Sequence, residues 1–182
     1  MRRRRRTKVT WMTLLVLLAG ILITYFDPQR QLINSTQVEE IGSSQAVSGF
    51  CTHVADGDTV VLQQGGRSTR VRLGGIDAPE KNQTYGDESK AELTRLIDGK
   101  QVYLVETDQD KYGRTVGVIF LREGDSFLNI NLAMLEAGAA WHYKQYSLGS
   151  AYADAEQHAR SAKRGLWAAP SPTPPWDFRH RR

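Results

Sequence analysis

An uncharged apolar run dominates the hydropathy pattern at the start of the chain. It covers residues 9–26 and follows five consecutive arginines at positions 2–6. A helix of that length rises about 27 Å, close to the ~30 Å hydrocarbon core of a bilayer. Arginines before the run place the basic segment 1–8 in the cytoplasm and the rest of the chain outside. The pattern predicts a single N-terminal transmembrane helix, with a cleaved signal peptide or a twin-arginine export signal as alternatives.

Shorter periodic segments follow and predict a folded domain of strands and helices. Helices are expected from an N-cap at Asp87 to Gly99, along the face formed by Leu128, Leu132, Leu135 and Ala139, and from about 150 to 164. β-branched and alternating residues predict strands at 59–62, 67–76, 101–106 and 115–121. Short strands mixed with segregated helices are typical of an α+β fold, in which a small sheet closes into a barrel.

Two segments flank this domain. Residues 27–50 lack sustained periodicity and begin with Asp27-Pro28, so they are interpreted as a spacer. Residues 168–182 contain four prolines and predict an extended basic tail outside the packed core. The range 51–167 remains, which is long enough for one compact core.

Composition and charge narrow the function classes. The 182 residues are 40% hydrophobic and 24% charged, which excludes disorder of the whole chain. The single cysteine, Cys51, excludes an intramolecular disulfide framework and a Cys-rich zinc site. The net charge of +4 comes from the ends, because residues 1–8 carry six cations whereas 51–167 holds 14 basic and 16 acidic side chains. The positive net charge of the chain is therefore no evidence for a nucleic-acid-binding face.

Three short segments carry candidate chemistry. They are Asp56-Gly57-Asp58-Thr59, the run from Arg72 to Glu80 (RLGGIDAPE), and Asp110-Lys111-Tyr112-Gly113-Arg114. Each segment alone could be an ordinary turn. Together they supply carboxylates and guanidinium groups. Phosphodiester hydrolysis needs a hard cation, which carboxylates can hold, a base for water, which a carboxylate can be, and fixed positive charge, which guanidinium groups provide.

In this order the three segments resemble the signature of the thermonuclease family, the staphylococcal-nuclease-like domains. The resemblance covers about 51–167 and extends to Tyr85-Gly86, to the segment LEAGAA at 135–140, and to Gly165-Leu166-Trp167. It implies a five-stranded OB-type β-barrel with three α-helices.

The resemblance also implies roles for individual residues. Asp58, Asp77 and the backbone carbonyl of Ala78 would hold Ca²⁺, for which oxygen ligands are suited. The family usually has threonine where this chain has Ala78, so a hydroxyl is lost while the carbonyl remains. Glu80 would be the general base that activates water.

The remaining roles concern the substrate. Arg72 and Arg114 would clamp the phosphate, because a planar guanidinium offers paired donors that lysine lacks. Tyr85, Trp141 and Tyr143 are candidates for substrate binding, with packing in the core as the alternative for each. Trp141 lies where the best-known enzyme of the thermonuclease family has a tyrosine. The four histidines show no metal-ligand spacing.

The expected function is that of a calcium-dependent, sequence-tolerant nuclease that cuts DNA and RNA to 3′-phosphate products. It would be tethered outside the cytoplasm through 9–26, with no obligatory protein partner. Two alternatives stay open: a non-catalytic OB-type module that only binds nucleic acid or protein, and an envelope interaction protein that works through its spacer and tail.

Overall fold

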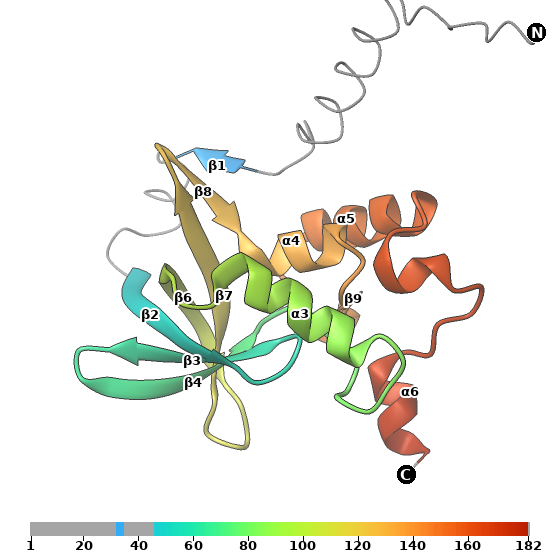
Figure 1. Ribbon diagram of the computed structural model, residues 1–182, viewed down its shortest axis with the longest axis horizontal. Coiled ribbons are helices and arrows are strands. Elements are labelled where there is room, and N and C mark those ends of the chain that lie inside the picture. Colours follow the sequence, from blue (N-terminus) through green and yellow to red (C-terminus); the bar gives the residue numbers. More distant parts are fainter. Residues whose placement is uncertain (1–31, 35–45, 182) are drawn as a thin grey trace, which may run out of the picture. The chain divides into compact units, whose positions relative to one another are not determined.

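The structure is a computed structural model that describes residues 32–34 and 46–181 (Figure 1). The segment 9–26, expected to cross the membrane, lies outside the described residues, as does most of the expected spacer. Within the described ranges, no helix has both the length and the apolar character needed to span a bilayer.

Five strands close into a barrel. The sheet order is β1-β8-β7-β4-β3-β2-β6, and an additional pairing of β7 with β6 closes the ring through β2, β3, β4, β6 and β7. The strands of this sheet are β1 (Leu32–Asn34), β2 (Ala46–Val54), β3 (Thr59–Gln64), β4 (Arg67–Leu73), β6 (Gln101–Gln109), β7 (Thr115–Glu123) and β8 (Ser126–Asn129). The pairing of β4 with β7 is parallel, and the other pairings are antiparallel. The five-stranded barrel predicted from the sequence is confirmed.

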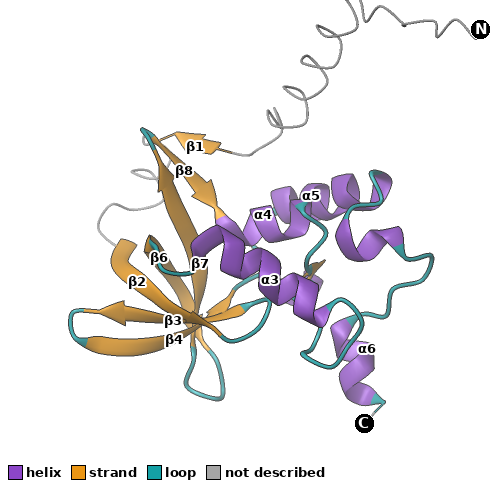
Figure 2. Ribbon diagram, viewed as in Figure 1, coloured by secondary structure: helices purple, strands orange, loops and turns teal. Residues whose placement is uncertain are grey.

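Helices cover one side of the barrel, as Figure 2 shows. They are α3 (Gly86–Ile97), α4 (Ile130–Glu136), α5 (Ser150–Ser161) and α6 (Pro175–His180), with short 3-10 helices at Lys144–Tyr146 and Gly165–Ala168. A second, two-stranded sheet pairs β5 (Ile76–Asp77) with β9 (Trp141–His142). The expected three helices are present as α3, α4 and α5, and α6 is additional within the described part of the chain.

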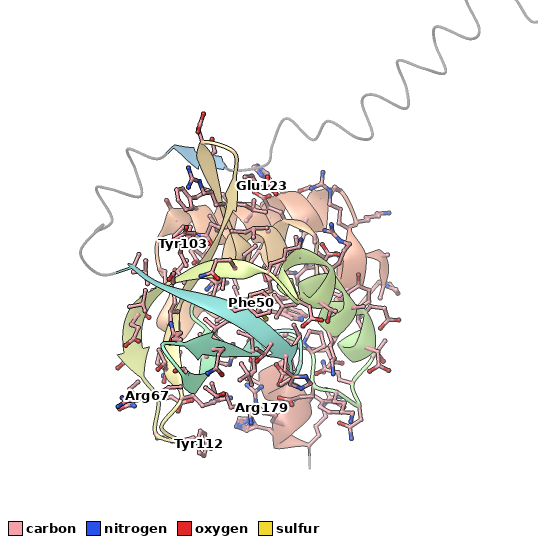
Figure 3. All side chains as sticks on the ribbon, turned by 60° about the vertical axis from the view of Figure 1, so that its left-hand side comes forward. Phe50, Arg67, Tyr103, Tyr112, Glu123 and Arg179 are labelled. Carbon is pink, nitrogen blue, oxygen red and sulfur yellow. The ribbon has the colours of Figure 1, made fainter. Side chains whose placement is uncertain are left out.

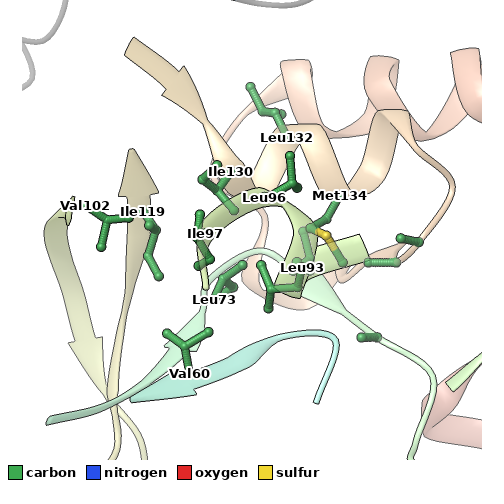
Figure 4. Packing of buried hydrophobic residues seen from close by; sticks show 14 of the residues in the cluster. Val60, Leu73, Leu93, Leu96, Ile97, Val102, Ile119, Ile130, Leu132 and Met134 are labelled. Carbon is green, nitrogen blue, oxygen red and sulfur yellow. The ribbon is translucent and has the colours of Figure 1, made fainter. Parts of the chain in front are cut away.

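The core lies between the barrel and α3. Leu93, Leu96 and Ile97 recur at helical spacing and form the buried face of α3. They belong to one cluster with Val60 of β3 and Leu73 of β4 (Figure 4). Burying a side chain of this size stabilises the fold by about 1.5–3 kcal/mol. This packing holds the start of β3 and the end of β4 in place, and candidate site residues lie at both ends.

The first barrel strand differs from the sequence interpretation. β2 begins at Ala46, inside the range expected to be spacer, and Cys51 lies within it instead of before the first strand. Gly49 and Cys51 face inward, whereas Val47 and Phe50 are 46% and 45% exposed. Among the larger apolar residues of β2 only Val54, at its end, is buried, so the rest of the strand lacks the usual hydrophobic alternation.

Three helix boundaries also differ. The helix expected to start at Leu128 begins at Ile130, because Leu128 pairs with Leu121 in the sheet. Helix α3 is capped by Tyr85 in the left-handed conformation instead of by Asp87. The expectation of an extended tail was wrong for 175–180, where α6 forms with Pro175 in its first turn, the helical position that proline favours.

Candidate active site

An open cleft of about 760 Å³ lies where strand ends meet α6. Figure 3 shows Tyr112 and Arg179 at the same end of the molecule, and both belong to the lining of the cleft. Seven of the nine site residues predicted from the sequence also line it: Asp58, Arg72, Asp77, Ala78, Glu80, Arg114 and Tyr143. The barrel therefore brings side chains from distant segments into one site.

The β3–β4 hairpin positions the first acid. Thr59 at the start of β3 pairs with Arg72 near the end of β4. Asp58 precedes β3 directly, and its backbone carbonyl accepts a hydrogen bond from the Leu73 N–H at 2.8 Å. The register of the hairpin therefore places Asp58 beside Arg72.

Gly57 allows the turn that carries Asp58 to pack closely against α3. A Cβ atom at this position would collide with the Ser89 hydroxyl and the Ala78 side chain. Ser89 is buried and donates its hydroxyl to the Ala139 carbonyl at 2.6 Å, so it has little freedom to move away. The glycine between the two aspartates is thus needed for packing.

One guanidinium group bridges the two buried aspartates. Arg72 Nη1 lies 3.1 Å from Asp58 Oδ2, and Arg72 Nη2 lies 2.9 Å from Asp77 Oδ1. Nη1 also donates to the carbonyls of Leu73 and Ile76, at 3.0 and 2.9 Å. These four contacts hold the Arg72 side chain in one orientation at the wall of the cleft.

The buried acids carry an electrostatic cost. Burial raises the pKa of Asp58 to about 7, and the nearby Asp56 and Asp77 carboxylates act in the same direction. Arg72 and the Ala78 N–H, which donates to Asp58 Oδ2 at 2.7 Å, oppose this rise. Negative charge on Asp58 is therefore disfavoured unless further positive charge reaches the site.

The donor set of this corner fits a hard divalent cation. Asp58 and Asp77 carry carboxylate oxygens, and the adjacent Ala78, whose backbone carbonyl the resemblance assigns to the metal, also lines the cleft. The described residues contain no cluster of three or more His, Cys, Asp or Glu side chains placed to bind a metal. The other ligands of a cation bound by these two aspartates would therefore be carbonyl oxygens or water.

Glu80 lies on the loop between β5 and α3. Its N–H donates to Gln83 Oε1 at 3.0 Å, and its carbonyl accepts from the Gln83 N–H at 2.8 Å. This reciprocal pair fixes the backbone of Glu80, while 39% of its side chain stays exposed. The carboxylate can therefore reach solvent from a rigid position, as a base that activates water must.

Arg114 reaches the cleft from the loop between β6 and β7. Its Nε donates to Asp110 Oδ2 at 2.6 Å, and its N–H donates to Asp110 Oδ1 at 2.9 Å. Burial raises the pKa of Asp110, but hydrogen bonds from Arg114 and the Tyr112 N–H outweigh it and lower the pKa below its usual value. Asp110 therefore stays ionised and holds Arg114 on the tip of the loop.

The three aromatic candidates for substrate binding lie in different surroundings in the structure. Tyr143 lines the cleft, whereas Tyr85 and Trp141 do not. Trp141 is 7% exposed and packs edge-on against Trp167 and Trp176, at centroid distances of 4.4 and 5.6 Å. Tyr85 packs against the core at the start of α3. Trp141 and Tyr85 therefore make packing contacts outside the cleft lining, and their role in substrate binding stays a prediction.

Sequence reasoning missed Arg179. Its Nη2 lies 2.8 Å from Asp77 Oδ2, and its Nη1 lies 2.8 Å from Glu80 Oε1 and 3.2 Å from Asp77 Oδ1. The hydrogen bond to Asp77 is the main reason that the pKa of Arg179 rises further above its usual value. The available signal was weak: a tryptophan and several arginines after a proline-rich stretch.

Most of the barrel and of the helices match a known protein family. A family model described as "Staphylococcal nuclease homologue" matches residues 70–169. The chain belongs to the staphylococcal nuclease family. Membership assigns it to the nucleases, hydrolases that cut phosphodiester bonds. The matched range includes Arg72, Asp77, Glu80 and Arg114, while Asp58 precedes it and α6 follows it.

Relatives support this family assignment. A protein of Escherichia coli O157:H7 named as an uncharacterized endonuclease is 40% identical over 136 residues, 75% of this chain and 87% of the relative. A protein of Haemophilus influenzae with the same name is 42% identical over 127 residues, 69% of each chain. A staphylococcal-like nuclease of Arabidopsis thaliana, CAN1, is 33% identical over 150 residues, 82% of this chain and 44% of the relative.

Proposed function

We propose that this member of the staphylococcal nuclease family is a calcium-dependent endonuclease that hydrolyses DNA and RNA with little sequence preference and leaves 3′-phosphate ends. The observation that carries the proposal is the convergence of two buried aspartates, a half-exposed glutamate and two arginines in one open cleft. A molecule that only bound nucleic acid would not need buried acids, which repel phosphate.

Calcium held by Asp58, Asp77 and the Ala78 carbonyl would supply positive charge next to the scissile phosphate. Glu80 accepts a proton from a water molecule on the open side of the cleft, and that water attacks phosphorus. The bond from phosphorus to the 5′-oxygen breaks and this oxygen takes a proton from solvent, so the 3′ end keeps the phosphate and the next fragment begins with a 5′-hydroxyl.

The two arginines bind the non-bridging oxygens, where negative charge grows during the attack. Arg72 is already fixed by two carbonyls, so its orientation does not have to be established when substrate arrives. Arg114 approaches from a separate loop, so the two guanidinium groups can hold the phosphate from different sides of the cleft. Fixed donors of this kind cost little reorganisation in the transition state.

Sequence tolerance follows from what the cleft offers to the substrate. The charged groups contact phosphate, which is common to all nucleotides. Tyr143 offers a ring face, and stacking of a base on an aromatic ring is worth about 1–3 kcal/mol for any base. No base-reading groups are needed in this scheme.

The proposal includes a location outside the cytoplasm. Its support is the uncharged run 9–26 behind five arginines. Free calcium is plentiful there, and the cell's own nucleic acids are out of reach. The segment would then act as a membrane tether, or as a signal if it is cleaved.

The proposal can be tested by incubating the full-length chain with plasmid, single-stranded DNA and RNA, with calcium or with a chelator. We expect cleavage only with calcium, and a loss of at least about 100-fold in rate for Glu80→Gln, because general bases contribute about 10²–10⁴. Glu88→Gln, on the exposed side of α3, is the matched control and should retain activity.

The products provide a second criterion. Fragments with 5′-hydroxyl ends accept phosphate from a polynucleotide kinase without prior dephosphorylation, whereas 5′-phosphate fragments do not. Plasmid that is bound in calcium but never fragmented would refute the enzyme and favour a non-catalytic binding module. Full activity of Glu80→Gln would remove Glu80 from the role of base.

A further inference from the structure

Helix α6 is docked on the candidate site through three contacts that do not involve charge. Gln83 Nε2 donates to the Thr173 carbonyl at 2.7 Å, just before the helix. The Trp176 ring stacks on Tyr143, with a centroid distance of 5.8 Å and an interplanar angle of 9°. The same Trp176 ring meets Trp141 edge-on at 5.6 Å. These contacts place the next turn of α6 over the acids of the cleft.

Arg179 fills that position. Its guanidinium contacts both carboxylate oxygens of Asp77 and one of Glu80, at 2.8–3.2 Å. In the proposed function, Asp77 holds the cation and Glu80 activates water. Arg179 therefore occupies the oxygens that the reaction needs free. Trp176 likewise covers a face of Tyr143, the ring proposed to stack on a base.

We infer that α6 is an internal competitor of the active site, in which Arg179 takes the place of the divalent cation and Trp176 takes the place of a nucleobase. The inference rests on the proposed function and adds regulation to it. Calcium binds weakly while α6 is docked, because a second positive charge must enter beside the Arg179 guanidinium. Cation and polynucleotide together displace the helix.

The docked helix is suited to reversible release. It has six residues, Pro175–His180, and a helix this short is not stable on its own. The Arg179 side chain is 42% exposed, so it can leave without opening the core. The affinity for a ligand that requires the undocked state falls in proportion to the fraction of molecules in that state.

The direct test is calcium binding to the full-length chain, measured by calorimetry with calcium as the only ligand. We expect Arg179→Gln to bind calcium about tenfold more tightly than the unmodified chain. Arg181→Gln is the matched control: it removes one positive charge from the same end of α6, and Arg181 contacts no carboxylate in the described part of the chain. It should change the affinity less than about twofold.

A second measurement follows the helix itself. Quenching of tryptophan emission by acrylamide should increase when calcium and an oligonucleotide with uncleavable linkages are added, because Trp176 leaves Tyr143. Trp176→Phe should abolish this increase. If Arg179→Gln fails to fold, Trp176→Ala takes its place in the test. This variant weakens docking of α6 without removing a contact to a carboxylate, and it should also bind calcium more tightly than the unmodified chain.

The outcomes separate the inference from the proposed function. Calcium affinity in Arg179→Gln that equals or falls below that of Arg181→Gln would overturn the inference while leaving a calcium-dependent nuclease intact. Loss of cleavage in Arg179→Gln at unchanged calcium affinity would also overturn it, because Arg179 would then serve the substrate. If no variant binds calcium or cuts nucleic acid, the proposed function fails, and the inference fails with it.

Discussion

Arg72 and Arg114 are held in different ways, and this difference bears on their roles. Arg72 is fixed by two aspartates and two carbonyls at the wall of the cleft. Arg114 is held on a loop by Asp110 and lies 5.6 Å from the centroid of the Tyr112 ring. Arg72 therefore also neutralises the buried acids, whereas Arg114 has no such role and is the cleaner probe of the transition state.

For Arg114→Lys we expect turnover to fall by about 10²–10³, with oligonucleotide affinity changed less than about threefold. Lysine keeps the charge but loses the planar pair of donors. The measurement is kcat together with Kd for an uncleavable oligonucleotide. Arg122→Lys, on the far part of β7, is the control and should change neither value. Equal losses in kcat and affinity would contradict a role specific to the transition state.

Asp58 links the site to stability. Because burial raises its pKa to about 7 from 3.8, the folded state binds an extra proton between these values. The contribution of Asp58 to the free energy of unfolding therefore falls as pH rises from about 4 to about 7 when no metal is bound. A buried acid that costs stability in this way is a candidate for a functional group.

Asp58→Asn removes the buried charge at nearly constant shape. Without metal at pH 7.5 we expect this variant to be more stable than the unmodified chain by about 2 kcal/mol. The rise in Tm that calcium gives the unmodified chain should be absent. Asp125→Asn, in the exposed β7–β8 turn, is the control for both measurements. A calcium-induced rise in Tm that persists in Asp58→Asn would show that the cation does not use this carboxylate.

At the scale of elements, the start of α3 determines where Glu80 lies. A Cβ at Gly86 would collide with the Glu80 backbone carbonyl, so the first turn of the helix sits directly against this loop. The Gly86 N–H donates to the Gln83 carbonyl at 2.9 Å and completes the loop. The helix and the proposed base therefore cannot move independently.

Gly86→Ala is expected to lower the free energy of unfolding by about 2–3 kcal/mol, the usual cost of overpacking, and to reduce cleavage because Glu80 is displaced. Urea unfolding and the plasmid assay measure the two effects. Gly124→Ala provides a control, since φ is 62° there and the space around it is open. Its cost should be about 1 kcal/mol, from backbone strain alone, with activity retained. Similar losses in both variants would contradict the collision.

The elements that the sequence predicted are those whose pattern is strong. β3, β6, β7 and α3 bury large apolar residues at regular spacing, and α5 is rich in alanine, so their positions were predicted to within a few residues. β2 was missed because two of its three buried positions are the small residues Gly49 and Cys51. α6 was missed because the prolines before it are typical of an extended tail, and because the ring contacts of Trp176 with Trp141 and Tyr143 join residues distant in sequence.

For the whole molecule, the charged groups on the barrel strands and loops could be predicted because they occur in three recognisable segments that barrel closure brings together. Arg179 could not, since its position depends on docking of the chain end against Tyr143 and Gln83. The aromatic candidates were ambiguous for a related reason: a ring that packs in the core and a ring that lines a cleft have the same local sequence.

The proposed tether makes a prediction about the complete protein. We expect the mature chain to retain residues 1–26 in its intact mass and to sediment with membranes. Removal of residues 1–26 should release it without changing kcat, because the site residues all lie at or beyond Asp58. Removal of the spacer residues 27–31 alone is a control that should leave the protein with membranes. An intact mass that begins after residue 26 would establish a cleaved signal in place of an anchor.

The parallel pairing of β4 with β7 has a consequence for the newly made chain. Val71 lies opposite Thr115, so the ring closes only after a long intervening segment has been ordered. Closing such a loop costs entropy before any contact repays it, and non-local pairing of this kind slows folding. Until it forms, Arg114 is far from Asp77. A chain in which β4 and β7 have not yet paired therefore lacks the assembled cleft, even when all the residues that line it have been made.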